Sequence, residues 1–184
     1  MSHTILFAGH MMDKPGRAVP RFPFFKSTPA GIAIRLRLQH ILRSTVREAA
    51  RGIAAGACGG DILFHEACRD LEVSSELYLA LPVNEFDKTS VAFGGEDWEV
   101  RYFDLVRTLP VHILFPEAKA DAGPEIWERA NEWMLKAALE NGGAEMTLLA
   151  LWDGNIGETG GTRNMIDVAR EHGADVEIID IKGI

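Results

Sequence analysis

The sequence predicts an α/β fold, a Rossmann-like, doubly wound and mainly parallel sheet with helices on both faces. Short apolar runs alternate along the chain with stretches whose apolar residues recur at helical spacing, and this alternation is typical of parallel sheets. Several of the runs end in a Gly-rich turn that leads into a helix. Because 47% of the 184 residues are apolar, one sizeable core is expected, so residues 1–184 are interpreted as a single domain.

The first half of the chain begins with a strand and a long loop. Residues 4–8 form an apolar run that suits a buried strand, and residues 9–31 are too rich in proline and glycine for a regular element. The apolar residues that follow predict an amphipathic helix running to about Arg51; they are Ile34, Leu38, Ile41 and Leu42. Residues 52–61 predict a strand of small residues closing in a glycine pair, and Asp61 stands where the N-cap of the next helix belongs.

The second half continues the alternation. Residues 84–108 are less regular and predict a loop followed by a short helix over 98–106. Residues 111–115 are either a strand or a buried link. The clearer expectations are strands over 76–83, 146–153 and 174–181, a helix from Pro124 to Gly142, and a helix over 162–172.

Composition excludes several classes of function. No stretch approaches the ~20 apolar residues of a membrane span, and the N-terminus lacks a signal-peptide pattern, so no membrane partner and a cytoplasmic location are expected. A net charge of −8 repels a polyanion, so no nucleic-acid partner is expected. The two cysteines and six histidines lack metal-ligand spacing, so no metal is expected.

Three loops that follow predicted strands are candidates for a binding site, because ligands of open parallel sheets bind beyond the carboxyl ends of the strands. Glycines there let the backbone approach a ligand, and the N–H groups at the start of a helix attract phosphate. Arg17 and Arg21 could be bidentate phosphate donors or merely solvated. The candidate ligand-binding residues are Gly9, His10, Arg17, Arg21, Gly59, Gly60, Asp61, Asp153, Gly160, Gly161 and Thr162.

Several side chains have a functional and a structural interpretation. Asp153 could hold a ribose hydroxyl or order the Asp-Gly turn, and His10 could polarise a ligand or cap its loop. Trp98 could stack on a base or belong to the core. Glu66 could be a catalytic carboxylate or an ordinary acid near a helix N-terminus. Neither GxxxxGK[ST] nor GxGxxG occurs in the Gly-rich loops, which disfavours ATP hydrolysis and hydride transfer, and no cofactor is expected.

Three motifs in order resemble the SLOG superfamily, which includes the Smf/DprA proteins, the LOG phosphoribohydrolases and the YpsA-like proteins. They are GH after the first strand, GACGGDILFHEA after the second, and LLALWDGNIGETGGTRNMIDVA near the end. The resemblance implies a Rossmann-like pocket for nucleotides or for nucleotide-derived molecules such as relatives of ADP-ribose, and it implies dimers. LOG enzymes use PGGxGTxxE with a catalytic Glu; here the Pro is absent and Met165 stands at the position of that Glu.

Three functions follow from the sequence. The first is a sensor that binds a nucleotide-derived, phosphate-bearing ligand and reports it to a partner or an attached effector; a homodimer is possible. The second is an N-glycosidic hydrolase or transferase acting on a nucleoside monophosphate, with Glu66 or Asp61 as its carboxylate. The third is a structural domain with collapsed loops that dimerises through the helix around Trp133.

Overall fold

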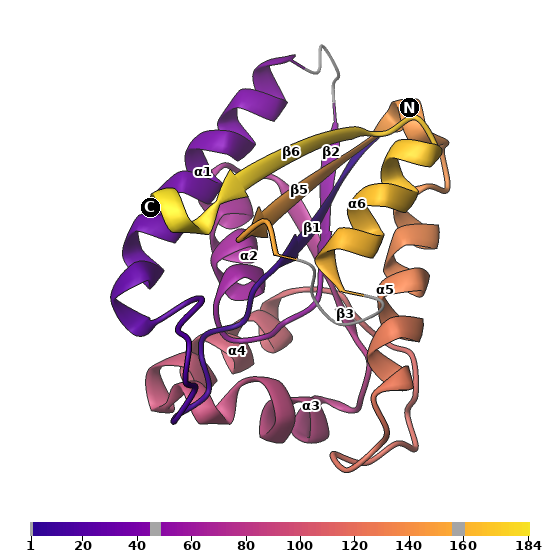
Figure 1. The fold of residues 1–184 in the computed structure, drawn as a ribbon. Helices are drawn as coiled ribbons and strands as arrows, with labels where there is room; N and C mark the ends of the chain where they lie inside the picture. Colours follow the sequence, from indigo (N-terminus) through magenta and orange to yellow (C-terminus); the bar gives the residue numbers. More distant parts are fainter. Residues whose placement is uncertain (1, 45–48, 156–160) are drawn as a thin grey trace.

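The computed structural model describes residues 2–44, 49–155 and 161–184. Over these residues the chain forms one sheet of six strands, all parallel, in the order β4-β3-β2-β1-β5-β6 (Figure 1). The mainly parallel sheet that the sequence predicted is therefore confirmed. The strands are β1 (His3–Gly9), β2 (Ala50–Ala54), β3 (Ser74–Leu79), β4 (Val111–Ile113), β5 (Met146–Trp152) and β6 (Asp175–Asp180).

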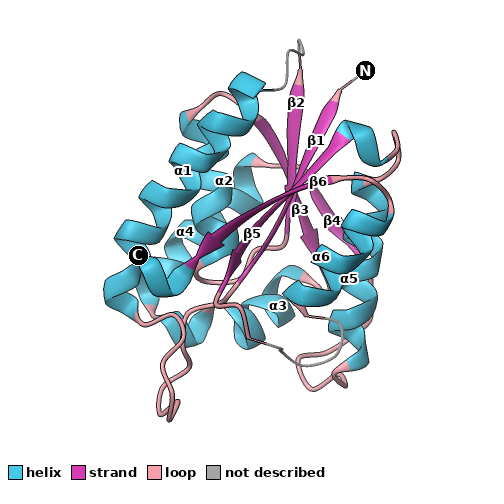
Figure 2. Ribbon diagram, turned by 45° about the horizontal axis from the view of Figure 1, so that its top comes forward, coloured by secondary structure: helices cyan, strands magenta, loops and turns pink. Residues whose placement is uncertain are grey.

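Helices cover both faces of the sheet, as Figures 1 and 2 show. One layer packs α1 and α2 against each other, with α4 on α2; the other layer contains α5 and α6. A short helix, α3, leads into α4 beside the carboxyl ends of the strands. The helices are α1 (Ser27–Ser44), α2 (Gly60–Asp70), α3 (Val83–Ser90), α4 (Glu96–Thr108), α5 (Glu125–Ala138) and α6 (Thr162–Glu171). None of these is long and apolar enough to span a membrane.

Strands β1 and β5 are buried on both faces. In β1, Ile5 and Phe7 belong to the hydrophobic cluster on the α1 and α2 side, whereas Leu6 and Ala8 belong to the cluster on the α5 and α6 side. Side chains alternate between the two faces of a strand, and a strand covered on both faces is therefore apolar throughout. This explains why β1 and β5 read as continuous apolar runs in the sequence.

Some boundaries differ from the sequence expectations. The helix expected to run to Arg51 ends at Ser44, because Ala50 and Arg51 pair with β1 in strand β2. The strand expected over 52–61 ends at Ala54. Asp61 is not an N-cap: Gly59 has that position.

The stretch 84–108 is mostly helical, as α3 and α4. Residues 111–115 contain a true strand, β4, which pairs with β3.

The order of the strands places the switch point between β1 and β5. From β1 the chain winds outward through β2 and β3 to β4, and it then crosses back to add β5 and β6 on the other side. Connections leave β1 and β5 in opposite directions, so a crevice opens at their carboxyl ends, where open α/β sheets bind ligands. Residues that follow Gly9 and Trp152 must border this crevice.

Candidate functional site

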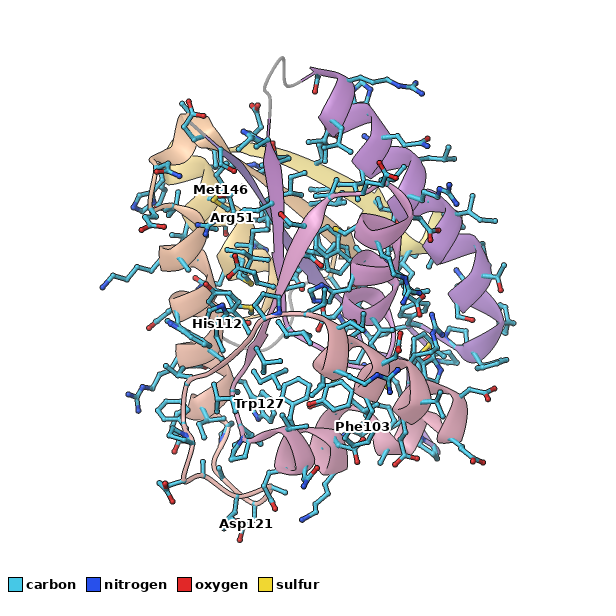
Figure 3. All side chains as sticks on the ribbon, turned by 180° about the vertical axis from the view of Figure 1, so that it is seen from behind. Arg51, Phe103, His112, Asp121, Trp127 and Met146 are labelled. Atoms are coloured by element: carbon cyan, nitrogen blue, oxygen red, sulfur yellow. The ribbon has the colours of Figure 1, made fainter. Side chains whose placement is uncertain are left out.

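A cleft lies at the switch point and has an outer and an inner part. The outer groove has a volume of about 710 Å³ and the inner cavity about 260 Å³. Figure 3 shows Trp127 toward the end of the sheet opposite Met146, the first residue of β5, which is the carboxyl end of the strands. Residues common to both walls are Met11, Ser90, Trp127, Asn131, Gly161 and Thr162.

The outer groove is basic. Four cationic side chains and one acid, Glu128, are among the described residues that line it. The groove wall is thus basic in a chain of net charge −8, while Asp13, Asp153 and Asp167 each pair with one of these cations. In salt solution the field of nearby groups exceeds that of distant ones, so the potential inside the groove depends more on these side chains than on the net charge of the whole molecule. The cations are Lys14, Arg17, Arg21 and Arg163.

Asp153, just after β5, organises the floor of the groove. Its carboxylate accepts hydrogen bonds from Arg21 Nε at 3.0 Å and from the backbone N–H of Asn155 at 3.1 Å. Burial alone would raise the pKa of Asp153, but the Arg21 and Asn155 bonds and the neighbouring His10 hold it well below its usual range. Asp153 is 3% exposed and does not line the cleft. The contact predicted with a ribose is therefore not direct in this arrangement; Asp153 orders the Asp-Gly turn and positions Arg21.

His10 completes this cluster. Its Nε2 atom lies 3.2 Å from Asp153 Oδ1 and 3.1 Å from Arg21 Nη2. Burial, and then the Arg21 guanidinium, lower the pKa of His10, so the ring is neutral at pH 7. A neutral ring can use Nε2 for one contact at a time, donating to Asp153 or accepting from Arg21. His10 lines the outer groove, so a bound ligand can change this choice.

The loop after β1 holds its arginines by its own hydrogen bonds. The Asp13 carboxylate accepts the backbone N–H groups of Arg21 at 2.9 Å and of Phe22 at 3.0 Å. The same carboxylate lies 3.5 Å from Arg17 Nε. The loop closes on itself, and Lys14, Arg17 and Arg21 are therefore carried together at the mouth of the groove.

The inner cavity contains a buried acid. Asp61, in the first turn of α2, accepts the backbone N–H of Ala57 at 3.1 Å and lines the cavity wall. Burial raises the pKa of Asp61 to about 7, so its carboxyl group can donate or accept a hydrogen bond near neutral pH. Aromatic walls face the same space; they are Phe7, Tyr78, Phe86 and Trp127.

The turn at Gly59 and Gly60 has a packing role. Gly59 has φ +116°, and an added Cβ would lie 2.8 Å from the Met12 nitrogen. The Gly60 N–H donates to the His10 carbonyl at 3.2 Å, and the Met12 N–H donates to the Cys58 carbonyl at 2.8 Å. Both glycines are buried, and neither lines the cleft. They were expected to contact phosphate; in the structure they join this turn to the loop after β1.

Two further expectations are corrected by the structure. Trp98 is 1% exposed, with the Arg101 guanidinium 3.9 Å from its ring centroid, so it belongs to the core and offers no free face to a base. Glu66 forms a bidentate ion pair with Arg101, at 2.7 and 2.6 Å, and lines a separate groove between α2 and α4. Glu66 is therefore not available as the catalytic carboxylate of this cleft.

The described part of the last glycine motif, Gly161 and Thr162, borders the cleft. Gly161 is the N-cap of α6, and Gly161, Thr162 and Arg163 line the outer groove. No acidic residue occupies the first turn of α6, so the partial positive charge of the helix N-terminus is not neutralised there. Gly160 lies outside the described residues. Met165, at the position of the LOG glutamate, is buried and lines the inner cavity.

Sequence reasoning missed part of the site. Trp127 and Asn131 are one turn apart on α5 and both line the cleft; a polar residue on the apolar face of a helix is the signal that could have found Asn131. Arg163 follows Thr162, which was named, and Lys14 lies three residues before Arg17. Cys58 is buried, and its pKa is raised to about 12 by burial, so it is not an activated nucleophile. The described residues contain no cluster of three metal-binding side chains.

Comparisons with known proteins add a likeness in fold. No family model and no curated protein matches the sequence. Among solved structures, the chain is similar to DNA processing protein A (DprA) from Streptococcus pneumoniae, with a TM-score of 0.47 and 12% identity. The match covers 95% of this chain and 58% of the DprA chain. The Rossmann-like fold class is established by the strand order itself.

Proposed function

We propose that the cleft at the switch point binds a nucleotide-derived, phosphate-bearing ligand and that the chain acts as a ligand-sensing domain. The observation that carries this proposal is the outer groove, where four cations meet the N-terminus of α6. Guanidinium groups and helix N-termini are the groups that proteins use to hold phosphate. The ligand class, a relative of ADP-ribose or NAD, comes from the motif resemblance described above.

The inner cavity supports a ligand with a planar part. A volume of about 260 Å³ accepts a heteroaromatic base with part of its sugar, while the groove of about 710 Å³ takes the phosphates and what they carry. Trp127 lines both parts of the cleft. It is therefore a better candidate than Trp98 for contact with a base.

A second candidate function is N-glycosidic cleavage with Asp61 as general acid. The observation that favours it is that Asp61 lines the inner cavity with a pKa raised to about 7, and a general acid works best when its pKa is near the working pH. In such a reaction Asp61 would protonate the departing base while water attacks the sugar carbon. The sensor needs no such group, so the two candidates differ in whether the ligand survives.

A thermal-shift screen with mass spectrometry of each mixture tests both candidates. The panel is ADP-ribose, NAD, cyclic ADP-ribose isomers, AMP and cyclic nucleotides, and a ligand that binds the folded state raises the melting temperature by mass action. A shift with the ligand recovered intact supports the sensor. A free base, absent from an Asp61→Asn sample, supports the enzyme. The absence of both a shift and a free base with every member of the panel contradicts both candidates and leaves a structural domain.

A further inference from the structure

One acidic side chain lines the inner cavity, and it is nearly buried. Among the described residues of the cavity wall, Asp61 is the one acid, and none is basic. Asp61 is 8% exposed, and most of the wall around it consists of aliphatic, aromatic and methionine side chains. A carboxyl group in such surroundings has lost most of its contact with water, so its hydrogen bonds must come from the protein or from a molecule in the cavity.

The two oxygens of this carboxyl group differ in their partners. Oδ2 accepts the backbone N–H of Ala57 at 3.1 Å. Oδ1 has no hydrogen-bond partner within the parts of the chain that the structure describes. Since Asp61 lines the cavity, Oδ1 is the atom left to bond a ligand there. An unpaired polar atom in an otherwise apolar cavity fixes the orientation of the ligand, because only a ligand with a matching group satisfies it.

The carboxyl group is protonated when the cavity is occupied. Burial raises the pKa of Asp61 to about 7, and only the Ala57 bond acts in the other direction. A base that enters the cavity removes the remaining water and thereby favours the neutral form further. Because Oδ2 accepts from Ala57, Oδ2 is the carbonyl oxygen, and the proton is on Oδ1. Oδ1 is therefore a hydrogen-bond donor toward the ligand.

The other titratable groups that surround this carboxyl group in the described chain are uncharged, paired or outside the cavity. Burial raises the pKa of Tyr78, on the cavity wall, and of Cys58, just before α2, and it lowers the pKa of His65, one turn further along α2. All three are uncharged near pH 7. Glu66 and Arg101 pair with each other in the groove between α2 and α4. The cations of the loop after β1 line the outer groove and not the inner cavity.

We infer that the inner cavity selects a base with an unprotonated ring nitrogen beside an amino group, as in adenine, and that Asp61 is the residue that recognises this edge. The inference rests on the proposed function, since it concerns the base of the ligand proposed above. Oδ1–H donates to the ring nitrogen, and Oδ2, which has a second lone pair, accepts from the amino group. Hypoxanthine carries an N–H at the same ring position, so two donors would oppose each other there.

Two other ligand groups would require an ionised Asp61. Guanine presents a ring N–H beside its amino group and needs two acceptors, and a positively charged ring needs a counter-charge. An ionised carboxylate would stand without a cation in an apolar cavity, which costs more free energy than the neutral acid does. The cavity therefore favours the amino edge of adenine. The two alternatives predict the opposite dependence of binding on pH, because they need the proton to be absent.

Matched pairs of ligands test the selection of the base without any variant. Calorimetric titrations at pH 6 compare ADP-ribose with its hypoxanthine counterpart, and AMP with IMP. The adenine member of a pair is expected to bind about tenfold more tightly or better, since a hydrogen-bonding site rejects an analogue that leaves its groups unpaired. Equal Kd values within the pairs overturn the inference and leave the proposed function standing, and a preference for hypoxanthine does the same. If no member binds at about 1 mM, the inference and the proposed function both fail.

The protonation of Asp61 is tested by pH. The Kd of ADP-ribose, whose pyrophosphate does not titrate in this range, is expected to rise about thirtyfold from pH 6 to 8.5, because Asp61 ionises above about 7 and loses the proton that it donates. Asp61→Asn is expected to keep the Kd of pH 6 within about threefold and to lose the pH dependence, since an amide accepts from Ala57 and donates to the ring nitrogen at any pH.

The control for this variant is Asp70→Asn. It removes a carboxylate from the other end of α2, where Asp70 is half exposed and pairs with Arg35, and it should keep the pH dependence of the unmodified chain. Circular dichroism confirms that both variants are folded. A Kd that falls as pH rises overturns the inference in favour of an ionised carboxylate. It is also overturned if Asp61→Asn binds ADP-ribose with the pH dependence of the unmodified chain.

Discussion

At the scale of single residues, the site depends on a nearly buried carboxylate held by groups from separate segments. Asp153 follows β5, Arg21 comes from the loop after β1, and His10 directly follows β1. Removing one partner leaves the charge of Asp153 with fewer hydrogen bonds, and that cost exceeds the value of the bond itself. Arg21 thus contributes to folding as well as to the basic mouth of the groove.

Replacing Arg21 tests this dual role. Arg21→Gln is expected to destabilise the fold by about 1–3 kcal/mol in urea unfolding, a figure kept low because Arg21 is 27% exposed. The pKa of His10 is expected to rise in an NMR titration, because the Arg21 cation is one of the groups that lower it. The control is Arg35→Gln, which breaks a half-exposed pair with Asp70 and should cost less than about 1 kcal/mol. Equal losses from the two variants would contradict a special role for Arg21.

Two buried titratable groups on α2 make the stability of the fold depend on pH in opposite directions. Asp61 titrates at about 7 when folded and about 4 when unfolded, so its favourable contribution is lost as pH rises from about 4 to 7. His65 titrates at about 4 when folded and about 6.5 when unfolded, so its contribution is lost as pH falls from about 6.5 to 4. His65 stays neutral because burial lowers its pKa, although the hydrogen bond between Nε2 and the Ala55 carbonyl favours the protonated ring. Nδ1 lies 2.9 Å from the Ser75 hydroxyl. In the unmodified chain these two changes of stability with pH largely cancel.

Asp61→Asn removes the pH dependence of stability that Asp61 contributes and leaves that of His65. The variant is expected to be more stable than the unmodified chain at pH 8, on the order of 2–4 kcal/mol, and about equally stable at pH 4. Its own stability should fall as pH is lowered through the His65 window. Urea unfolding at pH 4, 6 and 8 measures these differences. A difference that does not change with pH would show that Asp61 stays ionised in the folded chain.

At the scale of elements, the site is assembled by a joint between two connections. The loop after β1 and the turn before α2 exchange backbone hydrogen bonds through Met12, Cys58, His10 and Gly60. The joint has no room for a side chain at Gly59, whose added Cβ would meet backbone atoms of two residues of the other connection. Backbone cannot move aside as a flexible side chain can, so this contact sets the position of the basic loop.

Gly59→Ala is expected to loosen this joint. It should lower the free energy of unfolding by about 1–3 kcal/mol more than Gly95→Ala does. Both glycines have positive φ, +116° and +98°, and share the backbone strain, but nothing lies within 4 Å of an added Cβ at Gly95. Chemical unfolding of the two variants therefore separates the collision from the strain. Equal effects would mean that the loop shifts to accept the new methyl group at little cost.

Sequence reasoning found the elements more reliably than the roles of single residues. The strands β1 and β5 were predictable because burial on both faces makes a strand a continuous apolar run, and the helix after Pro124 because burial of one face imposes helical periodicity. The burial of Trp98 could not be predicted. Helical spacing shows which residues share a face of the helix, but it does not show which other element covers that face. A glycine pair such as Gly59-Gly60 occurs both in turns that bind phosphate and in turns that pack closely against other backbone. The backbone groups that contact this turn belong to a loop some 50 residues earlier in the sequence, so the sequence alone could not distinguish the two roles.

At the scale of the whole molecule, a small anion faces two opposing fields. The net charge of −8 repels it at long range, while the cations of the groove attract it at short range. Salt with a Debye length of about 8 Å screens the first field more than the second. Binding should therefore depend on where a positive charge lies and only weakly on how many the chain has in total.

Removing one positive charge at different positions, inside and outside the groove, tests this dependence. With a panel ligand that shifts the melting temperature, Lys14→Gln and Arg163→Gln are each expected to weaken binding three- to thirtyfold in calorimetric titrations at 150 mM salt, since each removes one cation near the phosphates. Lys136→Gln on α5 makes the same change of net charge outside the groove and should alter the Kd less than twofold. If all three variants weaken binding equally, the ligand responds to the overall field and the groove is not its site.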